Sequence, residues 1–176
     1  MCVEPILTER LDLISLSPDA IEALFAGDHA AEEEELGLLI PRDWPEPGDE
    51  RWLRIRLGQM RSDPAFQFWA VRLMALRSPT RVMVGHVGFH GPPDQRGTVE
   101  MGYTVLAPFR RKGYATEAVR GLMDWAAREH GVRRFRLSIA PLNAASMAIA
   151  ARFGFRYVGE HVDEVDSVEH EFELAL

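Results

Sequence analysis

The sequence contains a single cysteine, at position 2, so the chain cannot form an intrachain disulfide or build a metal site from several cysteines. No apolar run approaches the length of a membrane span, and the N-terminus, MCVEPILTER, lacks the basic and apolar segments of a signal peptide. Neither a GxxxxGK(S/T) loop nor a GxGxxG fingerprint is present. We therefore expect a cytoplasmic protein that has no membrane association and no standard nucleotide-binding loop.

Basic residues are outnumbered, because 27 acidic residues stand against 20 basic ones and give a net charge of −7. This balance disfavours nonspecific binding to nucleic acid, which needs a net basic face, and it suits a cationic substrate such as an amine. With 176 residues, 47% of them hydrophobic, the chain is long enough to bury a sizeable core. We expect a single domain over residues 1–176.

One segment, Thr98–Ala118, carries the strongest functional signal. Its sequence, TVEMGYTVLAPFRRKGYATEA, predicts a strand, a short loop and the start of a helix. The first turn of a helix has unpaired amides and the positive end of the helix dipole, and here the cations of Arg110, Arg111 and Lys112 stand beside it. Gly113 allows a ligand to approach the backbone closely. The segment therefore predicts a binding site for phosphate or pyrophosphate.

The other elements follow from hydrophobic periodicity and from helix and turn signals. Ser17 and Pro18 predict the start of a helix over Pro18–Ala26, and Gly48–Arg61 has the pattern of a second, amphipathic helix. Strands are expected around Leu11–Ile14 and at Phe66–Leu76, Arg81–Phe89, Thr98–Val105, Phe135–Ile139, Phe155–Val158 and Val168–Leu174. Further helices are expected from Ala115 to His130 and over Asn143–Phe153.

This chain resembles the Gcn5-related N-acetyltransferases (GNAT), in particular the RimJ/RimL-type branch that acetylates the N-termini of ribosomal proteins. The resemblance rests first on Arg110-x-x-Gly113-x-Ala115 following a strand that ends in GYTV. The segments ILTERLDLISL, GHVGF, PLNAAS and RFGF also resemble family elements, so the similarity spans nearly the whole chain and is least specific over residues 28–61.

The resemblance implies an α/β (α+β) fold with a mixed central sheet of about six or seven strands, splayed at the fourth and fifth strands, and about four flanking helices. It implies acetyl-CoA as the acyl donor, no metal, and direct attack of an amine in a ternary complex. The acceptor is open between a protein N-terminus and a small-molecule amine. By resemblance, the cofactor-binding residues are Tyr103, Thr104, Val105, Arg110, Arg111, Lys112, Gly113, Tyr114, Ala115, Thr116, Asn143 and Ser146.

Glu100 is the first candidate for the base, because it lies on the same strand face as Gly102 and Thr104 and would act through water. His86 and His90 remain alternatives. The need for a base depends on the acceptor. An α-amine has a pKa of about 7.7–8.0 and is partly neutral at pH 7, whereas deprotonating a lysine amine with a pKa near 10.4 costs about 4.6 kcal/mol at pH 7.

Several residues have a structural interpretation beside the functional one. Asn143 is a favourable N-cap, and by resemblance it also contacts the cofactor arm. Ser146 is implied to lie near the cofactor sulfur, which makes it the second catalytic candidate. Trp44 and Trp52 either line the acceptor pocket or pack in the core.

Some alternatives stay open at this point. His161 and His170, with Asp163 and Glu164 nearby, have metal-ligand side chains but no recognised spacing, so no metal is expected. A non-catalytic acyl-CoA-binding or regulatory module on the same fold is the alternative to an enzyme. The oligomeric state is also open between a monomer and a homodimer.

Overall fold

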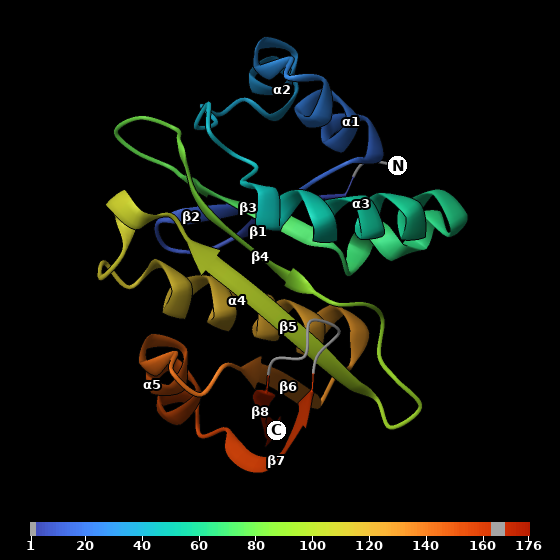
Figure 1. Ribbon diagram of the computed structural model, residues 1–176, viewed down its shortest axis with the longest axis vertical. Helices are drawn as coiled ribbons and strands as arrows, with labels where there is room; N and C mark the ends of the chain where they lie inside the picture. The colour runs from blue at the N-terminus through green and yellow to red at the C-terminus, as the bar shows by residue number, and fades with distance from the viewer. Residues whose placement is uncertain (1–2, 163–167) are drawn as a thin grey trace. The chain divides into compact units, whose positions relative to one another are not determined.

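The computed structural model describes residues 3–162 and 168–176 (Figure 1). Its internal contacts divide these residues into two compact units, which are described separately. The first unit contains the residues up to Gly88 together with Tyr103–Leu122, and the second contains Phe89–Gly102 and Met123–Leu176. Within the described residues, every helix is too short or too polar to cross a lipid bilayer.

The first unit is built on four antiparallel strands in the order β1-β2-β3-β4. Their bounds are β1 (Ile6–Leu7), β2 (Leu11–Ser15), β3 (Val71–Leu76) and β4 (Met83–Phe89), and the last residue of β4 belongs to the second unit. The single opening strand that the resemblance of Ile6–Leu16 implies is divided in two, because the chain turns between β1 and β2, where the Thr8 amide donates to the Leu11 carbonyl at 2.9 Å.

Three α-helices belong to this unit: α1 (Pro18–Ala26), α2 (His29–Leu36) and α3 (Pro47–Ser62). Helix α1 begins as predicted, because the Ser17 hydroxyl accepts a hydrogen bond from the Ala20 amide at 3.0 Å. Helix α2 was not predicted. The predicted start of β3 was also wrong, because Asp63 caps a short 3-10 helix, η1 (Pro64–Phe68), through the Ala65 amide at 3.0 Å.

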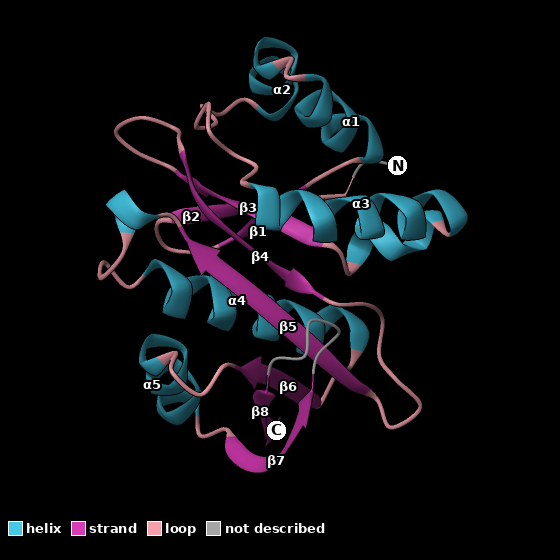
Figure 2. Ribbon diagram, in the orientation of Figure 1, coloured by secondary structure: helices cyan, strands magenta, loops and turns pink. Residues whose placement is uncertain are grey.

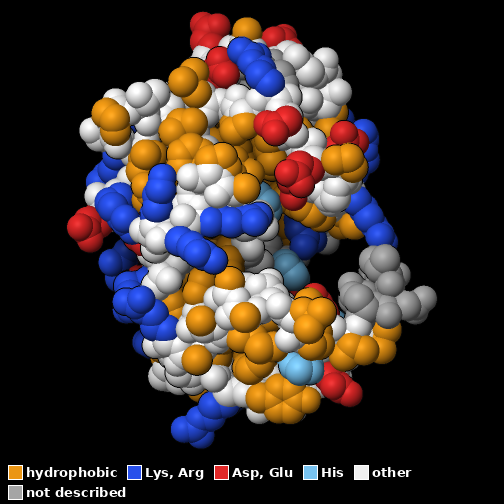
Figure 3. Space-filling model, turned by 60° about the vertical axis from the view of Figure 1, so that its left-hand side comes forward, with side chains coloured by type: hydrophobic (Ala, Val, Ile, Leu, Met, Phe, Trp, Pro, Cys, Tyr) orange, Lys and Arg blue, Asp and Glu red, His pale blue; other side chains and the backbone are white. Residues whose placement is uncertain are grey.

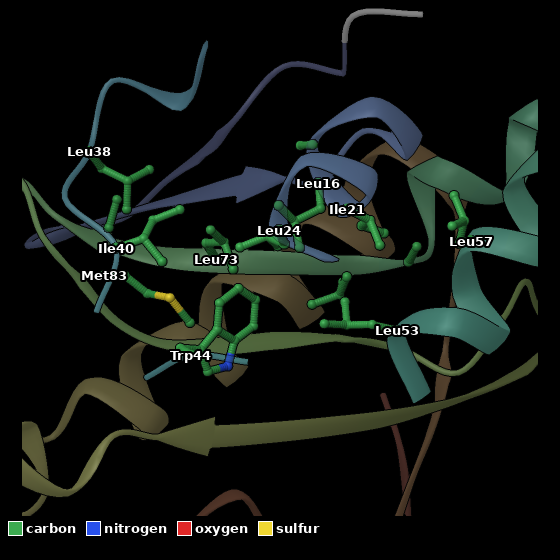
Figure 4. Close-up of a cluster of buried hydrophobic side chains, with 14 of the residues drawn as sticks. Leu16, Ile21, Leu24, Leu38, Ile40, Trp44, Leu53, Leu57, Leu73 and Met83 are labelled. Atoms are coloured by element: carbon green, nitrogen blue, oxygen red, sulfur yellow. The ribbon is translucent and has the colours of Figure 1, made fainter. Parts of the chain in front are cut away.

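The core of the first unit lies where these helices and strands meet. Figure 4 shows Ile21 and Leu24 of α1 and Leu53 of α3 facing Leu73 of β3. Trp44, from the loop before α3, is only 2% exposed and lies in the same cluster. A buried indole contributes a large apolar area, so Trp44 stabilises this core.

The second unit contains strands of both orientations (Figure 2). Its parallel pair is β5 (Thr98–Val105) and β6 (Arg134–Ile139), and the end of β5 from Tyr103 onward belongs to the first unit. Strand β6 pairs antiparallel with β8 (Val168–Ala175), which pairs with β7 (Arg156–Val162). Helix α4 (Tyr114–His130) contributes its C-terminal half, and α5 (Ala144–Phe153) lies entirely in this unit.

The parallel ladder between β5 and β6 is short. It joins Thr98 with Arg134 and ends at the pair Glu100 and Arg136, in the part of the chain that the structure describes, although β5 continues to Val105. An early end of this ladder is what a splay between the fourth and fifth predicted strands requires, because strands that diverge cannot exchange main-chain hydrogen bonds.

The predicted fold class, mixed α/β (α+β), is confirmed. The described residues form eight strands and five α-helices rather than the expected six or seven strands and four helices. Two features account for the difference: the opening strand breaks at the turn after β1, and α2 adds a helix that its polar sequence did not indicate.

Candidate functional site

The loop between β5 and α4 has an unusual backbone. It passes through a short 3-10 helix, η2 (Ala107–Phe109), and then reaches α4 through two residues of positive φ. Arg111 has φ 62° and Gly113 has φ 83°. A positive φ is rare for a residue with a side chain and is found preferentially at functional sites. Backbone that alternates between right- and left-handed conformations forms a concave nest of N–H groups that binds anions.

The main-chain amides of this loop have the unpaired donors that such a nest requires. Within the described residues, the main-chain N–H groups of residues 111–116 donate no hydrogen bond, and the first helical bond runs from the Glu117 amide to the Gly113 carbonyl at 3.1 Å. Six consecutive donors are therefore available at the positive end of the α4 dipole. Such a row suits a ligand with several anionic oxygens, such as a diphosphate.

The three predicted cations of the loop are exposed. The Arg110 Nε group donates to the Val105 carbonyl at 2.9 Å, so this side chain also fixes the end of β5. The Lys112 ammonium lies 5.5 Å from the centre of the Phe109 ring. Figure 3 shows Lys and Arg side chains at the surface in that view, although the net charge of the chain is −7. The loop thus combines amide donors with positive charge.

A further cation, Arg10, was missed by the sequence analysis. Its Nε group donates to a Glu117 carboxylate oxygen at 2.7 Å, and its Nη1 group donates to the Lys112 carbonyl at 2.9 Å. The other Glu117 oxygen accepts hydrogen bonds from the Thr8 hydroxyl and the Arg10 amide, both at 2.6 Å. Burial alone would raise the pKa of Glu117, but these bonds and the Arg10 charge lower it. The carboxylate therefore stays ionised and ties the start of β2 to the loop.

The end of β5 holds the predicted contacts for the cofactor arm, Tyr103, Thr104 and Val105. In the first unit, β4 lies directly against this segment, because the Leu106 amide donates to the Val84 carbonyl at 2.9 Å. A Cβ on Gly85 would lie 2.2 Å from the Thr104 carbonyl oxygen. Only glycine allows this close approach, which places the backbone of Thr104 firmly. The predicted contacts themselves stay a prediction.

In the second unit, Glu100 is the centre of a polar cluster. One of its carboxylate oxygens accepts a hydrogen bond from the Ser138 hydroxyl at 2.8 Å and lies 3.3 Å from His90 Nδ1. The other ring nitrogen of His90, Nε2, would lie 3.1 Å from a Cβ built on Gly102. Glu100, Gly102 and His90 therefore lie together, as the predicted strand face requires for the first two residues. Ser138 was not predicted.

The pKa of Glu100 reflects this cluster. Burial would raise it, but the hydrogen bond and charge of His90, the hydroxyl of Ser138 and the charge of Arg136 lower it from 4.5 to about 2. The folded state thus favours the ionised carboxylate. The stabilisation is complete above the ordinary pKa of a glutamate and is lost as the pH falls toward 2.

This shift predicts an acid-dependent difference between the wild type and Glu100→Gln. The wild type is expected to lose up to about 3 kcal/mol of its unfolding free energy relative to the variant between pH 5 and pH 2, because only the wild type must protonate this carboxylate. Urea unfolding of both proteins at pH 7, 4 and 3 measures the effect. A difference in unfolding free energy that stays constant with pH would contradict it.

Asn143 and Ser146 lie at the start of α5. The Asn143 side chain accepts a hydrogen bond from the Ser146 amide at 3.1 Å, so the structure shows its capping role. A role of either side chain toward a cofactor stays a prediction.

His86, an alternative base, lies in the first unit among aromatic residues. Its ring is 5.0 Å from that of Trp52 and 6.2 Å from that of Trp44, and its Nε2 is 3.4 Å from an Asp49 oxygen that also accepts from the Trp52 indole. Burial would raise the pKa of Asp49, but the His86 and Trp52 contacts lower it. Trp44 and Trp52 both pack against the core, which supports their structural interpretation.

The histidines that were considered as metal ligands lie in β7 and β8. Within the described residues, no group of three or more His, Cys, Asp or Glu side chains could hold a metal ion. His161 lies 3.7 Å from Glu171, and His170 lies 4.0 Å from Glu160. Cys2, Asp163 and Glu164 lie outside the described residues.

Comparison with known proteins places these features in a family. The sequence profile described as "Acetyltransferase (GNAT) domain" matches residues 10–156. An uncharacterised N-acetyltransferase of Bacillus subtilis, YjdG, is 28% identical over 151 residues, which cover 84% of this chain and 87% of that protein.

Solved structures share the fold. An acetyltransferase of Salmonella typhimurium that modifies the N-terminal serine of ribosomal protein L7/L12 has a TM-score of 0.65 at 16% identity, and the match covers 98% of this chain and 99% of that one. RimL, an L7/L12 α-N-protein acetyltransferase in complex with coenzyme A, has a TM-score of 0.65 at 18% identity, with 98% of each chain covered. The chain belongs to the acetyltransferase (GNAT) family, and it is an acyltransferase.

Proposed function

We propose that this protein transfers an acetyl group from acetyl-CoA to a primary amine, and that its acceptor is the α-amine of a protein N-terminus. The observation that carries the proposal is the row of six unpaired amides at residues 111–116, flanked by three cations. A diphosphate ester fits such a row, and RimL, a structural neighbour, is described in complex with coenzyme A. We also propose that residues 1–176 form one domain and that the protein belongs to the RimJ/RimL-type branch of the family.

In this proposal, the loop amides and the cations hold the diphosphate, and the backbone of Tyr103, Thr104 and Val105 binds the cofactor arm. The Val105 amide faces the thioester carbonyl as an oxyanion donor. Asn143 contacts the arm, and Ser146 lies near the sulfur. The amine nitrogen forms a bond to the carbonyl carbon and gives up its proton to Glu100, through water or through His90. The carbon–sulfur bond breaks, and the cofactor leaves as a thiolate, which is stable because a Cys-like thiol has a pKa of about 8.5.

The low pKa of Glu100 supports an α-amine as the acceptor. A carboxylate with a pKa of about 2 is a weak base, whether it receives the amine's proton through water or acts through His90. An α-amine is partly neutral at pH 7 and needs no strong base, whereas a lysine amine is almost fully protonated and does. Structural neighbours that modify the N-terminus of L7/L12 are consistent with this choice.

Two peptides that differ only at the N-terminus and at one internal position test the proposal. The first has a free N-terminal serine and no lysine, and the second has a blocked N-terminus and one lysine. With acetyl-CoA, the protein is expected to release free CoA thiol and to acetylate the first peptide at least tenfold faster than the second. Faster reaction of the lysine peptide would overturn the acceptor class. Binding of acetyl-CoA without turnover of any amine would favour the non-catalytic module.

A further inference from the structure

We propose that Arg10, which lies about a hundred residues before the loop in sequence, is itself a phosphate-binding residue, and that its Nη2 group donates to the diphosphate of acetyl-CoA. This inference rests on the proposed function. It adds a cofactor contact from the turn between β1 and β2, a segment in which the sequence gives no phosphate-binding signal.

The Arg10 guanidinium is held in one orientation. Nε donates to Glu117 at 2.7 Å, Nη1 donates to the Lys112 carbonyl at 2.9 Å, and the guanidinium carbon lies 4.7 Å from the centre of the Tyr114 ring. Two hydrogen bonds and an aromatic contact thus fix a planar group whose donors point in set directions. An arginine fixed in this way loses little side-chain entropy when it binds an anion.

The remaining donor of the guanidinium, Nη2, lies beside the loop. Nη2 makes no hydrogen bond within the residues that the structure describes, and it lies 3.4 Å from the place that a Cβ on Gly113 would occupy. Gly113 is in the middle of the six unpaired amides. The unbonded Nη2 group therefore lies beside the amide row, close enough for one phosphate group to accept from both.

Arg10 also neutralises the negative charge of Glu117. Glu117 would repel a phosphate at the start of α4, because a carboxylate there competes for the same amides and the same dipole. Its two oxygens are instead occupied by Thr8 and by Arg10. The ion pair cancels the repulsion, and the Arg10 side chain, 43% exposed, remains accessible to a ligand.

Arg77 offers a matched control for this arginine. Its Nε donates to Asp12 at 2.7 Å, its Nη1 donates to the Thr8 carbonyl at 3.0 Å, and its side chain is 40% exposed. Arg10→Gln and Arg77→Gln therefore each remove one carboxylate pair and one main-chain contact from the first unit. Similar decreases in thermal stability are expected, whereas only Arg10→Gln should change phosphate binding.

The test measures kcat/KM of wild type and both variants with acetyl-CoA, with acetyl-dephospho-CoA, which keeps the diphosphate, and with S-acetyl-pantetheine, which lacks it. Arg10→Gln is expected to lose tenfold to a hundredfold with the first two donors and little with the third, since a charge-assisted hydrogen bond is lost. Arg77→Gln should match the wild type with all three. Calorimetric titration with CoA should show the same loss in affinity.

The possible results distinguish a failure of the Arg10 contact from a failure of the proposed function. If wild type binds CoA and Arg10→Gln binds it equally well, the phosphate contact of Arg10 is wrong and the proposed function stands. An equal loss with S-acetyl-pantetheine also overturns the contact, because it would show that Arg10 only supports the loop. Failure of the wild type to bind CoA would instead contradict the proposed function.

Discussion

Replacement of Gly113 by Asp is expected to weaken acetyl-CoA binding at least a hundredfold. The Cβ of the new side chain would lie 3.4 Å from Arg10 Nη2, and its carboxylate would start in the middle of the unpaired amides, so it would occupy the donors that we assign to the diphosphate. It would also add a negative charge beside the ligand. The loss of one or two charge-assisted hydrogen bonds costs about 3 kcal/mol, which corresponds to this factor. Calorimetric titration with acetyl-CoA measures the change directly.

Gly131→Asp is the matched control for this experiment. Gly131, which directly follows α4, also has a positive φ, 67°, and nothing lies within 4 Å of its Cβ position. Both substitutions force a side chain into the left-handed region at a cost of about 1–2 kcal/mol, so both should lower stability similarly. Only Gly113→Asp should lose acetyl-CoA. Wild-type affinity in Gly113→Asp would show that the diphosphate does not bind at this loop.

The loop could be predicted from sequence because its geometry is local. A strand, a glycine that adopts positive φ and a helix start lie within about twenty residues, and each has a signal of its own. The positive φ of Arg111 could not be predicted, since arginine shows no preference for that region. It follows from the path that the chain takes between η2 and α4.

The other contacts of the site depend on the folded chain. Glu117 and Arg10 are 107 residues apart in sequence, and Glu100 and Ser138 are 38 apart. Neither pair has a spacing that sequence periodicity could detect, because strand and helix patterns report which residues share a face and not which faces meet. For the same reason, the sequence could not show that His90, which it offered only as an alternative base, contacts Glu100.

The second large effect is expected for Glu100→Gln, which should lower kcat for an α-amine acceptor about a hundredfold and leave acetyl-CoA affinity unchanged. General acid–base groups typically contribute about 10²–10⁴ in rate, and the substitution keeps the shape of the side chain while removing its charge. Ser138→Ala is the control, because it removes one hydrogen bond to Glu100 and keeps the carboxylate, so kcat should fall less than tenfold. Wild-type kcat in Glu100→Gln would show that this carboxylate is only structural.

A double-mutant cycle with His90→Gln then separates the two routes for the proton. The 3.3 Å contact between Glu100 and His90 Nδ1 leaves Nε2 beside Gly102, so the imidazole can take the proton while the carboxylate orients the ring. If the pair acts as a unit, the double variant should be no slower than the slower single variant. The first substitution already abolishes the joint contribution of the two residues, so the second has nothing further to remove. If Glu100 acts through water without His90, the two losses in kcat should multiply. We expect the non-additive result, since the same hydrogen bond that lowers the pKa of Glu100 makes it a poor base and a good partner for the histidine.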